Sequence, residues 1–329
     1  MNIYDIAQEA GVSIATVSRV INNKPNISAK TIRRVQEVLN KYNYVPSGIA
    51  QSLATNSSRL IGVILEDIRN RQYTNTAYAI EQELHEKAYK SLFCNVAPEN
   101  ILDYAKMLST AQVEGLVIIG SVFMNKDTVQ AIQTYLSDIP IIFANGTLPC
   151  PNVTSILCDD RDGIAQCVYH LVERGHSKIF YINDNNTDSA NRKLKGYRAT
   201  MFECALQDNI TVLQTESSFE GGIAIGKTLL TDFLYGRDYT ALIFPEDITA
   251  LGCIRVLAAN QLSIPSDVAV TGYGNTMFRI VASHNLTTVD THLGMLGSEA
   301  VRCICARLSN APCPAHMILT PELLIGETS

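Results

Sequence analysis

Apolar residues near the start of the chain recur at the three-to-four-residue spacing of an amphipathic helix. This spacing marks three short segments, at residues 3–10, 14–22 and 28–42. Gly11 lies between the first two, where a tight turn favours a residue that can adopt a left-handed conformation. Ser13 then stands where it can cap the second helix. Two helices joined by a glycine turn and followed by a third predict an all-α helix-turn-helix module.

From residue 59 onward, short apolar runs alternate with amphipathic segments of helical period. Such alternation is typical of parallel sheets covered by helices on both faces. Two series of about five strands predict two similar lobes, each built on a doubly wound parallel sheet. The predicted strands are residues 60–65, 92–96, 115–119, 139–143, 155–157, 178–182, 212–214, 240–244 and 267–272, and helices between them include 76–88, 126–136, 162–174, 190–206, 222–234 and 247–260.

Charge is unevenly distributed along the chain. The 329 residues carry a net charge of −6, whereas residues 1–58 hold six basic and three acidic side chains, a net charge of +3. The rest of the chain therefore carries −9. A basic head on an acidic body indicates that only the head binds an anionic polymer. With 47% hydrophobic and 18% charged residues, the chain has enough apolar material for a buried core.

Several classes of protein are not expected from the sequence. The N-terminus has no basic segment followed by an apolar one, as a signal peptide would, and the apolar runs are about half as long as a membrane span. Nine cysteines without a CxxC pair indicate reduced thiols in a cytoplasmic protein, and the histidines do not form a zinc pattern with them. We expect no metal, no cofactor, no membrane partner and no enzymatic activity.

The head carries a specific resemblance over nearly its whole length. From Ile3 to Ala54 the chain reads IYDIAQEAGVSIATVSRVINNKPNISAKTIRRVQEVLNKYNYVPSGIAQSLA. The AGVS and TVSRV strings and the Tyr-x-Pro tail closely resemble the head of the lactose/galactose repressor (LacI/GalR) family, and the resemblance continues to the C-terminus. It implies a helix-turn-helix domain over residues 1–58 and a periplasmic-binding-protein-like body over residues 59–329, which binds an effector and dimerises.

The resemblance assigns DNA contacts to individual residues of the head. Ile14, Ala15 and Arg19 fall where the family touches base edges in the major groove, and Asn26 lies at a weaker base-proximal position. An arginine can bond guanine, and small apolar groups can contact a thymine methyl. Hydroxyl and amide side chains fall at the family's phosphate contacts: Tyr4, Ser13, Thr16, Ser18, Asn22, Ser28, Thr31 and Tyr44. Capping and surface solvation remain the alternative for each of these hydroxyls.

A short segment after Pro46 resembles the family's hinge helix, at about residues 47–55. So short a helix is unstable alone, and in the family it forms on DNA, paired with that of the second subunit. Ala50 lies on its apolar face, and Leu53 matches the leucine that inserts between base steps in the minor groove. A plain linker is the alternative.

The two lobes are expected to share the body unequally along the chain. The N-lobe would hold about residues 59–158 and 291–318, and the C-lobe about residues 161–286 and 322–329. Ligands of such folds bind beyond the carboxyl ends of the strands, in the cleft between the lobes. The strand ends that match the family's effector contacts contribute Tyr73, Asn145, Arg192, Lys193, Phe219, Glu246 and Gly274.

Departures from the family pattern bear on the ligand. Gly274 stands where relatives usually have an aspartate after Gly-Tyr or Gly-Phe, while Glu246 adds an acid from another strand. The remaining set of aromatic, amide, carboxylate and ammonium groups suits a polyhydroxylated molecule such as a sugar or a sugar derivative, placed differently or carrying an amino group near Glu246. A remodelled pocket without a ligand is the alternative.

The resemblance implies a cytoplasmic transcription regulator, most simply a repressor. A homodimer would bind a near-palindromic operator, and a small effector in the cleft would control it. A solute-binding protein lacks the head, and an α/β enzyme would need a catalytic constellation that the sequence lacks. The closer alternative is a catabolite-control-type regulator that answers to a phosphorylated protein partner, for which the helix at 293–308 offers Arg302 and Arg307 but no adjacent pair.

Overall fold

The computed structural model describes residues 2–21, 24–43, 57–234, 236, 239–281 and 285–329 of the chain. The chain divides into two compact units, Met1–Arg59 and Leu60–Ser329, which we call the head and the body. None of the helices within the described residues is long and apolar enough to cross a membrane.

The head consists of three helices whose ends are set by local signals. Asn2 accepts hydrogen bonds from backbone N–H groups of the first turn, while the Asp5 carboxylate accepts one from Asn2 N–H, so the two residues form a capping box. The first helix ends at Gly11, whose φ of +60° is the left-handed conformation predicted for this turn. The helices are α1 (Ile3–Ala10), α2 (Ile14–Ile21) and α3 (Ala29–Lys41).

The three helices of the head surround a small apolar core. Its fully buried members include Ile6, Val17 and Val35, one from each helix. Lys41 and Glu9 form an exposed ion pair at 2.6 Å between α3 and α1, which adds little stability because water screens both charges. The predicted helix-turn-helix fold of the head is thereby confirmed, while the expected hinge helix at about 47–55 lies outside the described residues.

The first lobe of the body, the N-lobe, is built on a six-stranded parallel sheet. Its strand order is β11-β5-β4-β3-β1-β2. Strand β1 reads LIGVIL and is buried on both faces, as a strand inside a parallel sheet must be. The strands are β1 (Leu60–Leu65), β2 (Lys90–Asn95), β3 (Gly115–Ile119), β4 (Ile141–Ala144), β5 (Val153–Cys158) and β11 (His316–Leu319).

Helices cover both faces of the N-lobe sheet. Successive side chains of a strand point to opposite faces, so Ile61 and Val63 pack with α5 and α13, whereas Ile64 packs with α6 and α7. The helices are α5 (Arg71–Glu86), α6 (Ile101–Thr110), α7 (Lys126–Tyr135) and α13 (Leu293–Leu308), with short 3₁₀ turns at η1 (Pro98–Asn100) and η2 (Ser121–Phe123).

The second lobe, the C-lobe, repeats this plan. Its sheet has the order β12-β10-β9-β8-β6-β7, and all pairs except the antiparallel β10–β12 pair are parallel. Helices α8 and α9 cover one face and α10 and α11 the other. The elements are β6 (Ile179–Asn183), β7 (Thr211–Gln214), β8 (Ala241–Ile243), β9 (Ala269–Tyr273), β10 (Thr287–Asp290), β12 (Glu322–Leu324), α8 (Asp160–Glu173), α9 (Asp188–Glu203), η3 (Gln207–Asn209), α10 (Phe219–Leu234), α11 (Asp247–Ala259) and α12 (Phe278–Val281).

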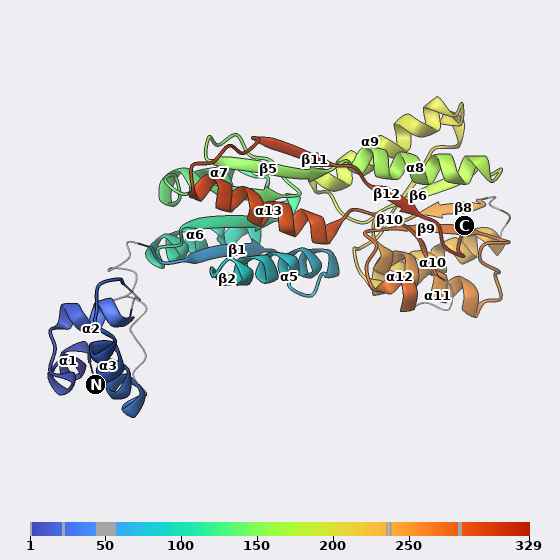
Figure 1. Cartoon of the computed structure of the whole chain (residues 1–329). Coiled ribbons are helices and arrows are strands. Elements are labelled where there is room, and N and C mark those ends of the chain that lie inside the picture. The colour runs from blue at the N-terminus through green and yellow to red at the C-terminus, as the bar shows by residue number, and fades with distance from the viewer. Residues whose placement is uncertain (1, 22–23, 44–56, 235, 237–238, 282–284) are drawn as a thin grey trace. The chain divides into compact units, whose positions relative to one another are not determined.

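The chain passes between the lobes at three places: after β5, after β10 and between β11 and β12. In Figure 1 the C-terminal segment passes from α13 and β11 in one lobe to β12 in the other. Each sheet has six strands, whereas the apolar runs mark five segments in the N-lobe and four in the C-lobe. The strands that the runs do not mark are β10, β11 and β12, which are three or four residues long and lie at these crossings.

The topology places the carboxyl ends of both sheets at the boundary between the lobes. In the N-lobe the strand order reverses between β1 and β3, and in the C-lobe it reverses between β6 and β8. Loops leave such a switch point in opposite directions and open a crevice there. The segments that follow β1, β3, β6 and β8 are therefore expected to form a ligand site.

Candidate functional site

The exposed face of α2 carries side chains suited to reading base edges. Ile14, Ala15 and Arg19 are exposed on this face. Val17 and Val20 lie on the opposite face and are buried in the head core. A guanidinium can make two hydrogen bonds to guanine, and small apolar side chains can contact a thymine methyl group, so this face has the chemistry of direct readout.

Two of the serines assigned to phosphate lie at helix N-termini. Thr16 N–H donates to Ser13 Oγ at 3.2 Å, and Thr31 N–H donates to Ser28 Oγ at 3.2 Å. Both serines are exposed, so their hydroxyls lie at the positive ends of α2 and α3, where an anionic oxygen is favoured. Capping and phosphate contact are therefore compatible at these positions.

The other assigned DNA contacts differ in exposure. Tyr4 is 66% exposed, Asn26 is exposed with a φ of 71°, and Ser18 is half-buried. Four assigned contacts lie outside the described residues: Asn22, Tyr44, Ala50 and Leu53.

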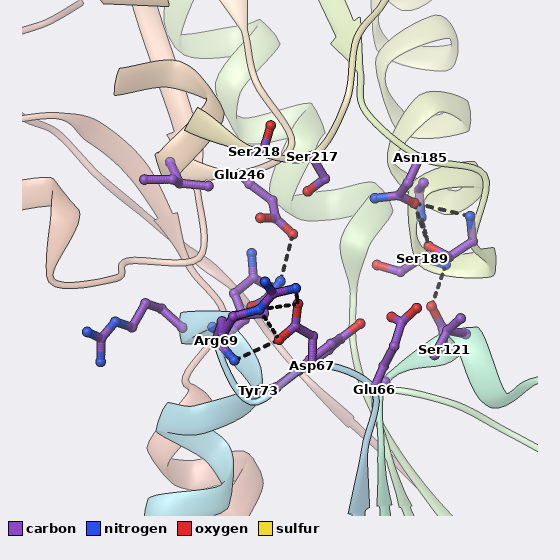
Figure 2. Close-up of a pocket in the computed structure, with 18 of the residues that line it drawn as sticks. Glu66, Asp67, Arg69, Tyr73, Ser121, Asn185, Ser189, Ser217, Ser218 and Glu246 are labelled. Atoms are coloured by element: carbon purple, nitrogen blue, oxygen red, sulfur yellow. Dashed lines mark hydrogen bonds and ion pairs between the residues drawn. The ribbon is translucent and has the colours of Figure 1, made fainter. Parts of the chain in front are cut away.

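A cavity of about 1080 Å³ opens between the two lobes of the body. Its walls follow the carboxyl ends of the strands at both switch points, as the topology predicts. Figure 2 shows side chains from both lobes facing one another across it. The polar residues that line the cavity include Glu66, Asp67, Arg69, Asn70, Gln72, Tyr73, Glu99, Ser121 and Asn145 from the N-lobe, and Asn185, Thr187, Ser189, Lys193, Ser217, Ser218, Glu220, Glu246, Asp247 and Thr276 from the C-lobe.

The structure brings most of the sequence-predicted effector residues to this one cavity. Two are not part of the lining. Arg192 turns to the carboxylates of Asp160 and Asp188, and Gly274 lies against the Gln72 side chain. The five predicted residues that line the cavity are Tyr73, Asn145, Lys193, Phe219 and Glu246.

Tyr73 reaches the N-lobe wall from the first turn of α5. Its ring packs over Gly120, where an added Cβ would lie 2.9 Å from the ring, so glycine makes the space that the tyrosine fills. Burial raises the pKa of Tyr73, and the negative charges of Glu66 and Glu246 raise it further. Tyr73 is therefore a neutral hydroxyl at physiological pH.

Lys193 is buried in the C-lobe wall. Its Nζ donates to the backbone oxygen of Pro245 at 3.0 Å and lies 3.9 Å from the centre of the Tyr273 ring. The cation is thus held by a carbonyl and an aromatic face rather than by a direct ion pair. It is the charge that balances the neighbouring carboxylates.

Those carboxylates belong to Glu246 and Asp184. Glu246 precedes α11 and accepts a hydrogen bond from Asn70 Nδ2 at 3.5 Å, which joins the two lobes across the cavity. Its pKa is raised to about 7, chiefly by burial and also by the charge of Asp184, against the lowering effect of Lys193 and of the Ser217 and Asn70 hydrogen bonds. Burial also raises the pKa of Asp184, which follows strand β6. Two acids therefore share one cation.

Asp160 is a second buried acid, at the first crossing between the lobes. Tyr273 OH donates to its Oδ1 at 2.8 Å, while Ser189 Oγ and Arg192 each donate to its Oδ2 at 2.8 Å. Ser189 N–H in turn donates to Ser121 Oγ of the N-lobe at 3.2 Å. Asp160 therefore fixes the wall of the cavity rather than lining it.

Sequence reasoning missed Glu66, Asp160 and Asp184. Each stands within two residues of the end of a strand, in β1, β5 and β6. That position was the signal that could have found them, because residues just beyond strand ends meet at the switch point. Within the described residues, the acids, histidines and cysteines do not gather into a group of three or more that could hold a metal ion.

The raised pKa of Glu246 predicts a pH-dependent effect of Glu246→Gln. Between the ordinary pKa of a glutamate and about 7, the folded chain keeps a proton that the unfolded chain loses, so wild-type stability falls as pH rises through this range. Because the carboxylate is reached by solvent in the cavity, we expect Glu246→Gln to be more stable than wild type by about 1 kcal/mol at about pH 8. The difference should shrink towards about pH 5, where wild type is protonated as well.

Thermal unfolding at the two pH values measures this difference, which corresponds to a shift of roughly 2–4 °C. Glu99→Gln is the matched control, because Glu99 lines the same cavity but is exposed. A shift of equal size at both pH values would contradict the assignment.

Comparison with known proteins identifies the relatives of the chain. Residues 2–47 match the model of bacterial regulatory proteins of the lacI family, and residues 168–329 match a periplasmic binding protein-like domain. The chain is 32% identical to an HTH-type transcriptional regulator of Lachnoclostridium phytofermentans, covering 100% of this chain and 99% of the relative. It is 30% identical to the HTH-type transcriptional regulator DegA of Bacillus subtilis, covering 99% and 97%.

A solved structure extends the likeness to the whole fold. The lac repressor dimer bound to operator and the anti-inducer ONPF superposes with a TM-score of 0.90 at 25% identity, covering 100% of this chain and 98% of that one. The family resemblance inferred from the head is thereby confirmed, and the relatives named here are regulators rather than enzymes. The chain belongs to the lacI family and is a DNA-binding transcriptional regulator.

Proposed function

We propose that the chain represses transcription as a homodimer on a near-palindromic operator. The observation that carries the proposal is the exposed face of α2, where Ile14, Ala15 and Arg19 stand clear of the head core. A two-fold dimer presents two such helices, one to each half-site. The lac repressor, a relative, is described as a dimer bound to its operator. Operator DNA lies in the cytoplasm, which is where we propose that the chain acts.

The proposed division of labour follows the two units of the chain. Residues 1–58 bind DNA, with the head reading the major groove and the segment at about 47–55 entering the minor groove through Leu53. Residues 59–329 bind the effector and hold the dimer together. Ala50 and Leu53 lie outside the described residues, so the hinge role is supported by the family resemblance.

We propose a polyhydroxylated small molecule, a sugar or a sugar derivative, as the effector in the cavity. Its lining supports this choice, because Asn145 and Asn185 supply amides while Tyr73 and Phe219 supply aromatic rings. Hydroxyl-rich ligands need such paired donors and acceptors. Arg192 and Gly274 do not belong to the lining, so any effect they have on effector binding would pass through the residues that they contact. Ligand binding and operator binding would be coupled reciprocally through the angle between the lobes.

Exposed apolar side chains support the dimer. Tyr78 on α5 is 68% exposed, and Ile280 on α12 is 68% exposed with Met277 beside it at 52%. Apolar residues on a helix face away from the core are typical of a subunit interface. We propose that α5 and the neighbourhood of α11 and α12 pair with their copies in the second subunit.

One experiment tests operator and dimer together. Selection from random double-stranded DNA with the full chain should yield a near-palindrome, and sedimentation of the complex should give two chains for each site. Tyr78→Lys, which places a charge in the proposed interface, should shift the free chain towards monomer and weaken operator binding at least tenfold. A selected site without two-fold symmetry, bound by one chain, would refute the proposal.

The catabolite-control alternative gains no support from the helix that would carry it. Arg302 Nε on α13 forms an ion pair with Glu299 Oε2, one turn earlier, at 2.6 Å. Arg307 follows five residues later, so the two arginines are not adjacent. A phosphorylated partner would need free cations close together on this face. The effector-controlled repressor therefore remains the function that we propose.

A further inference from the structure

We propose that the effector carries a protonated amine, so that the ligand class is a small polyhydroxylated amine such as an amino sugar or an amino polyol. This inference rests on the proposed effector-binding function and adds a charge to its ligand. It is carried by two carboxylates in and beside the cavity whose hydrogen bonding is incomplete, Glu246 and Asp184.

Glu246 presents its carboxylate to the cavity, where its hydrogen-bonding neighbours are the uncharged Asn70 amide and Ser217 hydroxyl. Its hydrogen bond with Asn70 is long, at 3.5 Å, and comes from an amide without charge. Figure 2 shows the Glu246 side chain reaching from the C-lobe towards Asp67 and Tyr73 on the opposite wall. A carboxylate has room for about four hydrogen bonds, so most of its acceptor capacity faces the space that a ligand would fill.

Asp184 supplies the second, independent observation. Its side chain is 6% exposed, and Asn185 Nδ2 donates to its Oδ1 at 2.9 Å. Its Oδ2 is buried and has no partner at hydrogen-bond distance among the described residues, although the nearby Ser217 hydroxyl lowers the pKa of this carboxyl. A buried carboxylate oxygen without a donor is costly to keep, and such an atom at a binding site is explained by a donor that the ligand brings. Asp184 stands directly before Asn185, a residue of the cavity wall.

The charges around these acids do not balance. Lys193 is the nearby cation, and it already faces the Pro245 carbonyl and the Tyr273 ring. On the N-lobe wall, Glu66 adds another acid, Asp67 binds Arg69 at 2.7 Å, and Arg71 is a further, exposed cation. The described lining of the cavity still holds six acids against three cations, an excess of negative charge. An ammonium group would neutralise it and provide up to three donors, which a sugar hydroxyl cannot do.

The rest of the cavity favours hydroxyls on the same ligand. Ser217 and Ser218 stand beside Glu246, while Ser189 lies near Asn185 and Ser121 lies between Ser189 and Glu66 (Figure 2). Neutral hydroxyls and amides exchange hydrogen bonds with a polyol at little cost in desolvation. A bare alkyl diamine would leave these groups unpaired, so the lining points to an amine on a hydroxylated frame.

Calorimetric titration of the full chain with matched pairs tests the proposal. Glucamine and sorbitol, like glucosamine and glucose, differ in an amine that replaces one hydroxyl, whereas N-acetylglucosamine also carries an acetyl group. We expect glucamine to bind at least tenfold more tightly than sorbitol at about pH 8, and E246Q to lose this preference. Glucosamine, whose amine is a weaker base because it lies beside the anomeric carbon, is compared with glucose at about pH 7. E216Q, which removes an exposed charge next to Ser217 but outside the lining, should keep it.

A pH series separates charge recognition from a mere change of shape. Glucamine stays protonated from about pH 6 to about pH 8, as an alkylammonium does, so its affinity should rise by about tenfold as Glu246 ionises. The other charged or titratable groups that line this part of the cavity are Glu66, Asp67, Arg71, Tyr73, Lys193, Glu220 and Asp247, and Asp184 is buried beside it. A flat profile in E246Q assigns the rise to Glu246.

The outcomes are distinguishable. Sorbitol or glucose binding as tightly as its amine would overturn the amine and leave the sugar effector standing. Putrescine binding more tightly than glucamine would overturn the hydroxylated frame. Failure of every compound to bind wild type would overturn this inference together with the proposed effector class.

Discussion

Replacing Asp160 by alanine is expected to destabilise the body by about 3–5 kcal/mol, because it breaks a buried ion pair and leaves its partners unpaired. Asp160 is 1% exposed and accepts hydrogen bonds from Tyr273, Ser189 and Arg192. Without the carboxylate, the buried Tyr273 OH loses this acceptor, and Arg192 keeps the more exposed Asp188 and a long hydrogen bond to Asn145 Oδ1 at 3.5 Å. Urea unfolding of the full chain, followed by circular dichroism, measures the loss.

Asp67→Ala is the control for burial. Asp67 pairs with Arg69 at 2.7 Å, close to the 2.8 Å of the Asp160–Arg192 pair, but both partners are solvent-accessible, Arg69 at 87%. Exposed pairs contribute about 0–1 kcal/mol, so Asp67→Ala should cost little. If the two variants lost similar amounts of stability, burial would not be what makes the Asp160 network matter.

Arg19→Ala should weaken operator binding by about 1–3 kcal/mol and relax the preference for one base pair in each half-site. The reason lies in the position of Arg19, exposed on the same face of α2 as Ile14 and Ala15. A guanidinium forked onto a guanine discriminates between bases, whereas one resting on phosphate does not. Fluorescence anisotropy with the selected operator and its single-base variants measures both effects.

Arg33→Ala is the control for Arg19→Ala. It also removes one exposed arginine from a helix of the head, but from α3 instead of α2. It should leave the base preference intact and at most weaken binding evenly. An even loss on all operator variants for Arg19→Ala would make Arg19 a phosphate contact, and the assignment of α2 as the reading helix would fail.

The regular parts of the fold could be predicted from the sequence because burial imposes its pattern on them. The unbroken apolar runs predict Leu60–Leu65 and Gly115–Ile119 with the bounds that the structure gives. Glu322–Leu324 was not predicted as a strand, because three residues are too few to carry a period and its partner β10 lies more than thirty positions earlier. The strands at the crossings between lobes depend on pairing between segments that are far apart in the sequence, and a local pattern of residues does not reveal such pairing.

The candidate site was predictable in its location but not in its contacts. Strand ends indicate which segments meet, and this brought Tyr73, Asn145 and Glu246 to one cavity. The sequence could not show which of the adjacent cations Arg192 and Lys193 lines the cavity. Neighbouring residues on a helix point about 100° apart, so the answer depends on how α9 is rotated about its axis. Lys193 lines the cavity, while Arg192 turns to Asp160.

Gly274 sets a limit on how far the two halves of the body can approach each other. Its φ is +117°, and a Cβ added there would lie 3.0 Å from Nε2 of Gln72, a residue of the opposite lobe. A larger residue at this point would be strained by the positive φ and would press on the end of the Gln72 side chain. The missing side chain thus lets the two walls meet here without displacing Gln72.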